Sequence, residues 1–302
     1  MTQQPRLSIV IPTFNRPAFL ARLLDSLVNQ DIELEQFVVL IVSDGSTDHT
    51  HSYLESFCQT HTTFAWYTQQ NQGPAAARNF GLARTNTAYV AFTDDDCIAD
   101  PGWVRSILSL FDEQPSLLGM EGRTITIREQ MTPFTHYVEG DGDCFASCNV
   151  AYRRQELIDL EGFDTRFFYG NEDVDLAWRM MKKGRVVFND RMVIVHPPVP
   201  RSFFKFVRHP ETYGVEILLY QNHPEQYVQT KKHTPLYVIF LSIGLRYLPG
   251  QIKSSFRMSS ANPLLFFEAV IALLMQRIWL IGLAPRFLAM YLGLIKRSRS
   301  YV

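Results

Sequence analysis

Three consecutive carboxylates, Asp94, Asp95 and Asp96, directly follow an apolar run, residues 88–92, that is typical of a buried strand. Because side chains alternate along a strand, we expect Asp94 and Asp96 on one side of it and Asp95 on the other. Like charges this close repel each other, and burying them is costly unless a cation or hydroxyl donors gather there. A magnesium or manganese ion held together with the phosphates of a nucleotide diphosphate meets that need. A solvated acidic loop is the alternative that the triplet alone leaves open.

Two other polar segments also follow predicted strands. The sequence PTFNR, residues 12–16, comes after an apolar run at 7–12, and DGSTD, residues 44–48, comes after a second run at 37–43. Strands and helices alternate over about 115 residues, which is typical of an α/β fold with a parallel sheet flanked by helices. Ligands of such sheets bind at the carboxyl ends of the strands. The three polar segments are therefore expected to meet, and their coincidence favours a nucleotide site.

The remaining elements are predicted from the spacing of apolar residues. We expect the helix that runs through Phe57 to be capped at its start by Ser46 or Thr47. The other predicted helices cover residues 17–28, 101–113, 153–160 and 172–183, and one opens at Gly73-Pro74; further predicted strands cover residues 64–68, 119–127, 145–152, 186–188 and 192–195.

The charge distribution divides the chain into two parts. Residues 1–200 contain 26 acidic and 16 basic side chains, which gives a net charge of −10. Residues 201–302 contain 4 acidic and 13 basic side chains, which gives a net charge of +9. The proline cluster at 196–200 marks the predicted boundary between a catalytic domain, residues 1–200, and a C-terminal region, residues 201–302. The four cysteines form no disulfide framework, and the first residues lack the apolar core of a signal peptide, so we expect a cytoplasmic protein.

The C-terminal region contains two apolar runs. Residues 236–248 are too short to cross a bilayer unaided, and residues 263–284 are long enough but include Glu268, Gln276 and Arg277. A charge at the centre of a span costs roughly 2.5–3.5 kcal/mol. We expect helices that lie in or against the cytoplasmic face of a membrane, with Lys296, Arg297 and Arg299 facing anionic lipid. A helical lobe packed on the catalytic domain, or an oligomer interface, is the alternative.

Five short motifs recur here in an order and spacing that resemble a known family. They are SIVIPTFNR (residues 8–16), DGSTD (44–48), QGPAAARN (72–79), DDD (94–96) and GNED (170–173). Over residues 7 to about 197 the chain resembles family 2 glycosyltransferases with the GT-A fold, a Rossmann-like sheet flanked by helices. The resemblance implies an inverting transferase that uses a nucleotide-diphospho-sugar, most often a UDP-sugar, together with Mn²⁺ or Mg²⁺.

The resemblance also implies roles for individual residues of the donor site. Asp44 would accept hydrogen bonds from the base, Asp94 would hold the ribose hydroxyls, and Asp96 with His196 would bind the metal that bridges the diphosphate. Pro12, Thr13, Phe14, Arg16, Arg78 and Asp95 would complete the nucleotide and phosphate site.

The acceptor hydroxyl must lose a proton as it attacks the sugar, and Asp173 is our candidate for the general base. Glu172 would bind the acceptor, although an acidic pair at a helix start also complements the helix dipole. Trp178, like Trp103, could stack on a sugar or pack in the core. We expect Asp175 on a helix face, and structural roles for the cysteines Cys97, Cys144 and Cys148.

Other functions are weighed against this one. The family's processive synthases carry a Gln-x-x-Arg-Trp motif after the Glu-Asp pair, and its absence favours single addition to a glycan or lipid-linked acceptor. A sugar-phosphate nucleotidyltransferase is an alternative, but that class usually carries a glycine-rich loop with a basic residue right after the first strand, and PTFNR at residues 12–16 is not such a loop. A non-catalytic, membrane-anchored relative that binds nucleotide-sugar is a further alternative. Nucleic-acid binding is disfavoured, because the basic excess lies in apolar segments. The sequence does not identify the sugar, the nucleotide base or the linkage that is formed, and a homo-oligomer remains an option.

Overall fold

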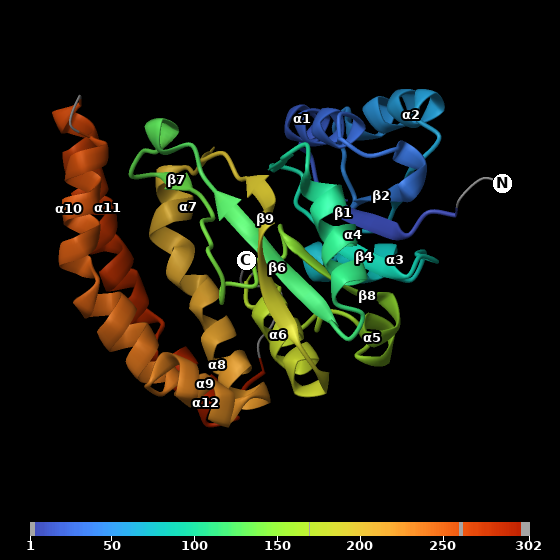
Figure 1. Ribbon diagram of the computed structural model, residues 1–302. Helices are drawn as coiled ribbons and strands as arrows, with labels where there is room; N and C mark the ends of the chain where they lie inside the picture. The colour runs from blue at the N-terminus through green and yellow to red at the C-terminus, as the bar shows by residue number, and fades with distance from the viewer. Residues whose placement is uncertain (1–3, 169, 260–261, 297–302) are drawn as a thin grey trace. The chain divides into compact units, whose positions relative to one another are not determined.

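The computed structural model describes residues 4–168, 170–259 and 262–296 (Figure 1). The chain forms two compact units. Unit 1 contains the described residues of 1–127, 137–168 and 172–197, and unit 2 contains those of 128–136, 169–171 and 198–302. The chain therefore passes between the units several times, and the domain boundary placed after residue 200 stays a prediction.

A mixed sheet of eight strands runs through unit 1, in the order β3-β2-β1-β4-β8-β6-β9-β5 (Figure 1). Strand β1 pairs in parallel with β2 and β4, and β2 pairs in parallel with β3. Their carboxyl ends therefore meet at one edge of the sheet, as the sequence predicted. Strand β8 runs antiparallel to β4 and β6, and β6 pairs in parallel with β9. The strands are β1 (Leu7–Thr13), β2 (Phe37–Ser43), β3 (Phe64–Thr68), β4 (Tyr89–Phe92), β5 (Ile98–Ala99), β6 (Gly119–Ile125), β8 (Val150–Arg153) and β9 (Val186–Val195).

Helices cover both faces of this sheet because alternate residues of its inner strands are apolar on opposite sides. Ile9 packs in a cluster with side chains of α1 (Pro17–Val28), α2 (Thr50–Thr60) and α4 (Trp103–Glu113). Its neighbour Val10 packs in another cluster, with side chains of α3 (Pro74–Leu82), α5 (Arg154–Asp159) and α6 (Glu172–Lys183). The result is a three-layer α/β unit, which confirms the predicted fold class.

Three sequence-based expectations need correction. Helix α2 starts later than expected, and Asp48, not Ser46 or Thr47, accepts the hydrogen bond of the Thr50 N–H at 3.0 Å. The strand expected over residues 145–152 begins only at Val150, and residues 186–195 form one strand rather than two. The register of β9 against β6 shifts between residues 122 and 123 of β6, and this irregularity explains why the sequence of β9 shows two separate apolar runs.

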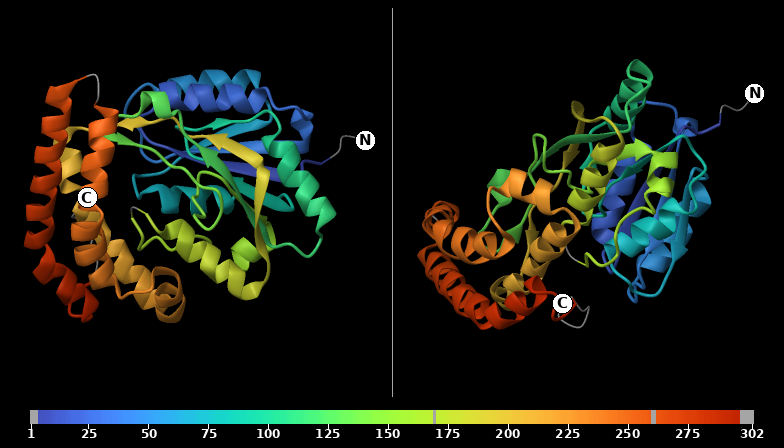
Figure 2. Two further views of the ribbon diagram at one scale, coloured as in Figure 1. Left: turned by 60° about the vertical axis from the view of Figure 1, so that its left-hand side comes forward. Right: turned by 90° about the horizontal axis from the view of Figure 1, so that it is seen from below.

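Unit 2 is mostly helical and has its own apolar core, formed by Ile217, Ile239, Leu280, Phe287 and Met290. Helices α10 and α11 lie side by side in each view (Figures 1 and 2). Its elements are η2 (Arg128–Gln130), β7 (Thr135–His136), β10 (Val199–Pro200), α7 (Phe203–Arg208), η3 (His209–Tyr213), α8 (Gly214–Asn222), α9 (Pro224–Lys231), the π-helix η4 (Tyr237–Arg246), α10 (Leu248–Met258), α11 (Pro263–Gly282) and α12 (Ala284–Tyr291).

Among the described residues, α11 alone is long and apolar enough to cross a membrane, and the π-helix η4 is a shorter apolar segment. Lys296 is exposed, whereas Arg297 and Arg299, which we expected to face lipid, lie outside the described residues.

Candidate functional site

The loops that follow β1 and β2 are tied to each other by hydrogen bonds. The side-chain oxygen of Asn15 accepts the Thr47 N–H at 2.8 Å, and the Asn15 N–H donates to Ser46 Oγ at 3.0 Å. The Asp44 N–H donates to the Thr13 carbonyl at 2.8 Å. Asn15 adopts the left-handed conformation, φ 53°, which Asn tolerates better than most residues. These contacts hold the two expected nucleotide-binding segments together at the carboxyl edge of the sheet.

Asp44 is buried and organises the loop that precedes α3. Its carboxylate accepts hydrogen bonds from the backbone N–H groups of Gln72 and Gly73, both at 2.8 Å, and from the side chain of Gln69 at 2.7 Å. A carboxylate has about four acceptor positions, so one remains for a ligand donor. The expected contact of Asp44 with a nucleotide base stays a prediction, and its hydrogen bond with Gln69 was not predicted from the sequence.

The carboxylate triplet does not alternate as a strand would. Strand β4 ends at Phe92, and Asp95 and Asp96 lie in the turn that follows, where the alternation of strand side chains no longer applies. The guanidinium of Arg16 therefore contacts both, with its Nη1 3.2 Å from Asp95 Oδ1 and 2.8 Å from Asp96 Oδ2. The expectation that Asp95 points away from its neighbours is wrong.

Asp95 is held inside the protein rather than exposed to a ligand. Thr13 Oγ1 donates a hydrogen bond to it at 2.7 Å, and the residue is only 4% exposed. Burial raises the pKa of its carboxyl to about 7, and the charge of Asp96 adds to this against the opposing effect of Arg16. Asp95 therefore supports the loop geometry of Thr13 and Arg16, and direct contact with the donor stays a prediction.

Arg78 links the triplet to the start of α6. Its Nη2 lies 2.5 Å from Asp94 Oδ1, and its Nη1 lies 3.1 Å from Glu172 Oε1. Burial alone would lower the pKa of Arg78, but the charges of Asp94 and Glu172 raise it, so this 2% exposed guanidinium stays charged. Only Arg can bridge two carboxylates in this way with a planar set of donors. Arg78 thereby holds Asp94 next to Glu172, although 94 residues separate Arg78 from Glu172.

Asp173, the candidate base, is fixed by two backbone donors. Its Oδ2 accepts the Ser147 N–H at 3.0 Å, and its Oδ1 accepts the Val174 N–H at 2.8 Å. Burial, together with the charge of Glu172, raises the pKa of Asp173 to about 7. The neighbouring Glu172 is 5% exposed, and within the described structure its buried Oε2 atom accepts no hydrogen bond. One carboxyl can thus exchange a proton near neutral pH, and the other retains a free acceptor.

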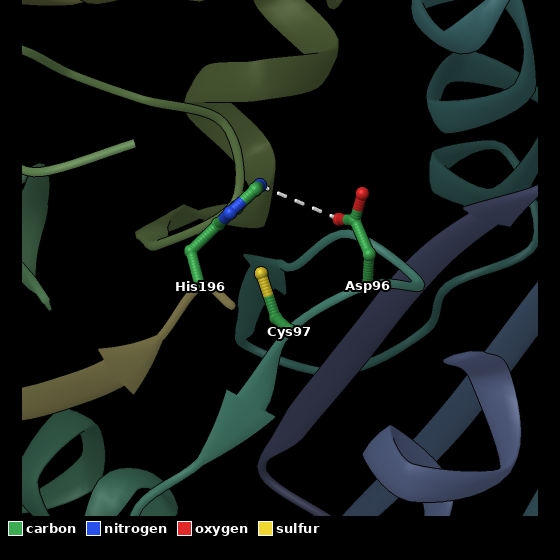
Figure 3. A group of neighbouring side chains, drawn as sticks. All are labelled: Asp96, Cys97 and His196. Carbon is green, nitrogen blue, oxygen red and sulfur yellow. Dashed lines mark ion pairs between the residues drawn. The ribbon is translucent and has the colours of Figure 1, made fainter. Parts of the chain in front are cut away.

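Three buried side chains converge where a metal ion could bind. One donor atom each of Asp96, Cys97 and His196 lies within 4.8 Å of the others (Figure 3). His196 Nε2 lies 3.5 Å from Asp96 Oδ1, and burial, followed by the thiol of Cys148, raises the pKa of the Cys97 thiol well above its usual value. The Asp96 carboxylate suits Mn²⁺ or Mg²⁺, and an imidazole such as that of His196 is a common ligand of divalent metals, so the pair is compatible with the expected ion. The approach of Cys97 was not foreseen, and its only signal was its position next to Asp96.

The other residues singled out in the sequence occupy varied environments. Pro12 is buried, whereas Phe14 is 44% exposed and available to a ligand. Trp178 is only 4% exposed, so its role as an acceptor-stacking surface is corrected to that of a buried residue. Trp103 is fully buried and donates from Nε1 to Asn149 at 2.8 Å. Asp175 pairs with Arg179 one turn along α6, at 2.8 Å, as expected of a helix-face residue.

Sequence comparison identifies relatives of known class. The family described as "Glycosyl transferase family 2" matches residues 8–133. The pre-mycofactocin glycosyltransferase of Mycobacterium tuberculosis is 29% identical over 208 residues, covering 63% of this chain and 42% of that protein. The GalNAc(5)-diNAcBac-PP-undecaprenol beta-1,3-glucosyltransferase of Campylobacter jejuni is 33% identical over 94 residues, 30% of each chain. The chain thus spans less than half the length of these curated relatives.

Solved structures share the fold at low sequence identity. The mannosyltransferase PcManGT from Pyrobaculum calidifontis, in complex with GDP-Man and Mn²⁺, has a TM-score of 0.63 and 20% identity over 95% of this chain and 88% of its own. Residues 1–349 of S. aureus TarS, in complex with UDP-GlcNAc, have a TM-score of 0.61 and 18% identity over 93% and 92%. The match over residues 8–133 thus supports the resemblance to glycosyltransferase family 2, and the likeness to these solved structures shows that the chain has the GT-A fold.

Proposed function

We propose that this protein moves one sugar from a nucleotide-diphospho-sugar to a hydroxyl of a glycan or lipid-linked acceptor, with inversion at the anomeric carbon. The observation that carries the proposal is the bridge from Arg78 to Asp94 and Glu172. It brings Asp94, which follows β4, next to the start of α6, where Asp173 lies. A donor-binding group and a proton acceptor are thus available on adjoining parts of one site.

The donor half of the site is proposed to hold a UDP-sugar. Phe14 offers an exposed aromatic face to the nucleotide, and Asp44 retains an acceptor position for the base. Asp94 would accept the ribose hydroxyls, and Asp96 with His196 would hold Mn²⁺ or Mg²⁺. The metal, when bound, supplies a Lewis acid beside the diphosphate, where negative charge develops as the sugar leaves. The neighbours' complexes with UDP-GlcNAc and with GDP-Man and Mn²⁺ support this donor class.

The acceptor half is proposed to act through Asp173. Its pKa near 7 leaves a substantial fraction of the carboxylate ionised at neutral pH and still basic enough to accept a proton. The acceptor oxygen forms a bond to the anomeric carbon as the bond from that carbon to the phosphate oxygen breaks. The acceptor proton passes to Asp173, and the electron pair leaves with the diphosphate. The unoccupied acceptor atom Glu172 Oε2 is suited to a neighbouring acceptor hydroxyl.

The acceptor class and location are proposed from chemistry and from relatives. The name of the Campylobacter jejuni relative includes a PP-undecaprenol acceptor, which is a lipid-linked glycan. Residues 201–302 combine a net charge of +9 with long apolar segments, which suits the cytoplasmic face of a membrane. We therefore propose a polysaccharide-building transferase that works on an acceptor at that surface.

Isothermal titration of the purified chain with UDP, GDP and dTDP, each with and without Mn²⁺, tests the donor site. We expect Mn²⁺-dependent binding of UDP that is weakened in Asp96→Ala and His196→Ala and retained in Asp173→Asn. Cys97→Ser is the matched control, because it changes the neighbouring thiol and leaves the two proposed ligands in place. Absence of binding by all three nucleotides would refute the donor site, and equal binding with and without Mn²⁺ would refute the metal role.

A further inference from the structure

Helix α11 has an outward stripe of large apolar side chains. They recur every three or four residues, so they share one face of the helix. Each is at least half exposed: Leu264 67%, Phe267 60%, Ile271 53%, Leu274 50%, Ile278 71% and Ile281 69%. Glu268 is the single acidic residue among them. Scattered exposed apolar residues are ordinary, but a continuous stripe along a 20-residue helix marks an interaction surface.

Two polar residues of α11, Gln276 and Arg277, are instead hydrogen-bonded to other parts of unit 2. Gln276 is 4% exposed and donates from Nε2 to the Phe206 carbonyl at 2.9 Å. Arg277 donates to the Gly244 carbonyl at 2.9 Å and to the Ile243 carbonyl at 3.2 Å. A helix that left unit 2 to cross a bilayer would carry these groups into hydrocarbon without their partners, which is costly. The helix is therefore built to stay packed against unit 2 with its apolar stripe outward.

Basic and aromatic side chains are exposed on α10, the helix that packs beside α11 (Figures 1 and 2). The exposed side chains of α10 include Lys253, Phe256 and Arg257, and Arg246 and Tyr247 are exposed immediately before it. Phe256 is 62% exposed and Tyr247 is 55% exposed. We call the exposed side chains of α10 and α11, with Arg246 and Tyr247, the outer face.

We propose that the outer face docks on the surface of an anionic lipid bilayer, with α10 and α11 lying in its plane. This inference deepens the proposed function, because it names the surface that would bring the enzyme to a lipid-linked acceptor. A helix with an apolar stripe, accompanied by exposed basic side chains and by aromatic ones such as Tyr247 and Trp279, has the composition of helices that lie in the membrane interface. A second copy is a poorer match, because two outer faces would oppose their own positive charges.

Flotation of the full-length chain with vesicles tests the proposal. We expect binding to vesicles of phosphatidylcholine mixed with phosphatidylglycerol, weaker binding to phosphatidylcholine alone, and weakening by salt. Ile278→Glu should lower the partition coefficient at least tenfold, which corresponds to about 1.4 kcal/mol. Lys253→Gln and Arg257→Gln should each lower it about fivefold on anionic vesicles and hardly at all on neutral ones. Ile158→Glu, at a 38% exposed isoleucine of α5 in unit 1, is the matched control and should bind as the parent does.

Two further measurements separate the outcomes. Circular dichroism and UDP titration on the same samples show whether Ile278→Glu is folded, and they report on the donor site independently of the vesicles. Brominated lipid should quench Trp279, which is 43% exposed on α11, and this quenching should disappear in Trp279→Phe. Unchanged vesicle binding of Ile278→Glu would overturn the proposal. The proposal would also be overturned if the parent chain failed to bind anionic vesicles and light scattering showed that it is a dimer which Ile278→Glu dissociates.

Discussion

Replacing the proposed base by its amide should increase stability at alkaline pH while abolishing transfer. The folded protein raises the pKa of Asp173 to about 7, chiefly through burial, whereas an unfolded Asp titrates near 3.9. Between those values the folded state binds the proton more tightly than the unfolded state. The stability of the parent chain therefore falls as pH rises through this window, because ionising the folded carboxyl costs free energy. Asp173→Asn has no such cost at any pH.

The magnitude follows from the size of the shift. A rise of about 3 pKa units corresponds to a cost of about 4 kcal/mol at pH 8 and about 1.5 kcal/mol at pH 5. We halve both values, because solvent reaches the half-buried side chain and screens its charge. The amide offers one acceptor oxygen to Ser147 and Val174 where the carboxylate offers two, a loss of about 1 kcal/mol. Asp173→Asn should thus stabilise the protein by about 1 kcal/mol at pH 8 and have almost no effect, or a slightly destabilising one, at pH 5.

Urea unfolding at pH 5 and pH 8, followed by circular dichroism, measures this difference. Asp48→Asn is the control with the opposite sign: desolvation alone would raise the pKa of Asp48, but hydrogen bonds from Thr50 lower it, so the amide should not stabilise at pH 8. Loss of a general base should lower kcat by about 10²–10⁴-fold while UDP affinity is kept. If Asp173→Asn destabilises the protein more at pH 8 than at pH 5, the folded state favours the ionised carboxylate and the reasoning is refuted.

Two further substitutions test the frame of the site. Arg78→Met should destabilise the protein by about 3–5 kcal/mol, because it leaves two carboxylates without their buried partner. Arg166→Met, at an exposed arginine, is the control. If urea unfolding shows that Arg78→Met loses less than about 1 kcal/mol of stability, the proposed bridge is contradicted. Gly45→Ala should cost about 1–3 kcal/mol, because φ is +79° and a Cβ would meet the Asn71 nitrogen at 2.9 Å. Gly250→Ala, in a helix with no atom within 4 Å of its Cβ position, should instead stabilise by up to about 1 kcal/mol, and equal thermal midpoints for both variants would count against the strained turn.

The sequence alone determined the order of the elements and the edge of the sheet that carries the site. Apolar runs such as β1 and β2 end sharply in polar turns, and parallel pairing brings those ends together wherever such strands are adjacent. The acidic start and basic end of α6 also followed from local composition, because both complement the helix dipole. These features depend on neighbours in the chain, so local pattern was sufficient to predict them.

Only the tertiary structure decided which charges meet. Arg78 is separated from Glu172 by 94 residues, and no local pattern relates them; their contact exists because α3 and α6 cover the same face of the sheet. The approach of Cys97 to His196 likewise depends on β5 pairing with β9. The orientation of α11 was also decided by tertiary contacts. In the sequence, Gln276 and Arg277 do not form a single polar stripe with Glu268, so the pattern alone does not show which side of the helix is buried. Folding turned Gln276 and Arg277 toward Phe206 and Gly244, and left the stripe of large apolar side chains exposed.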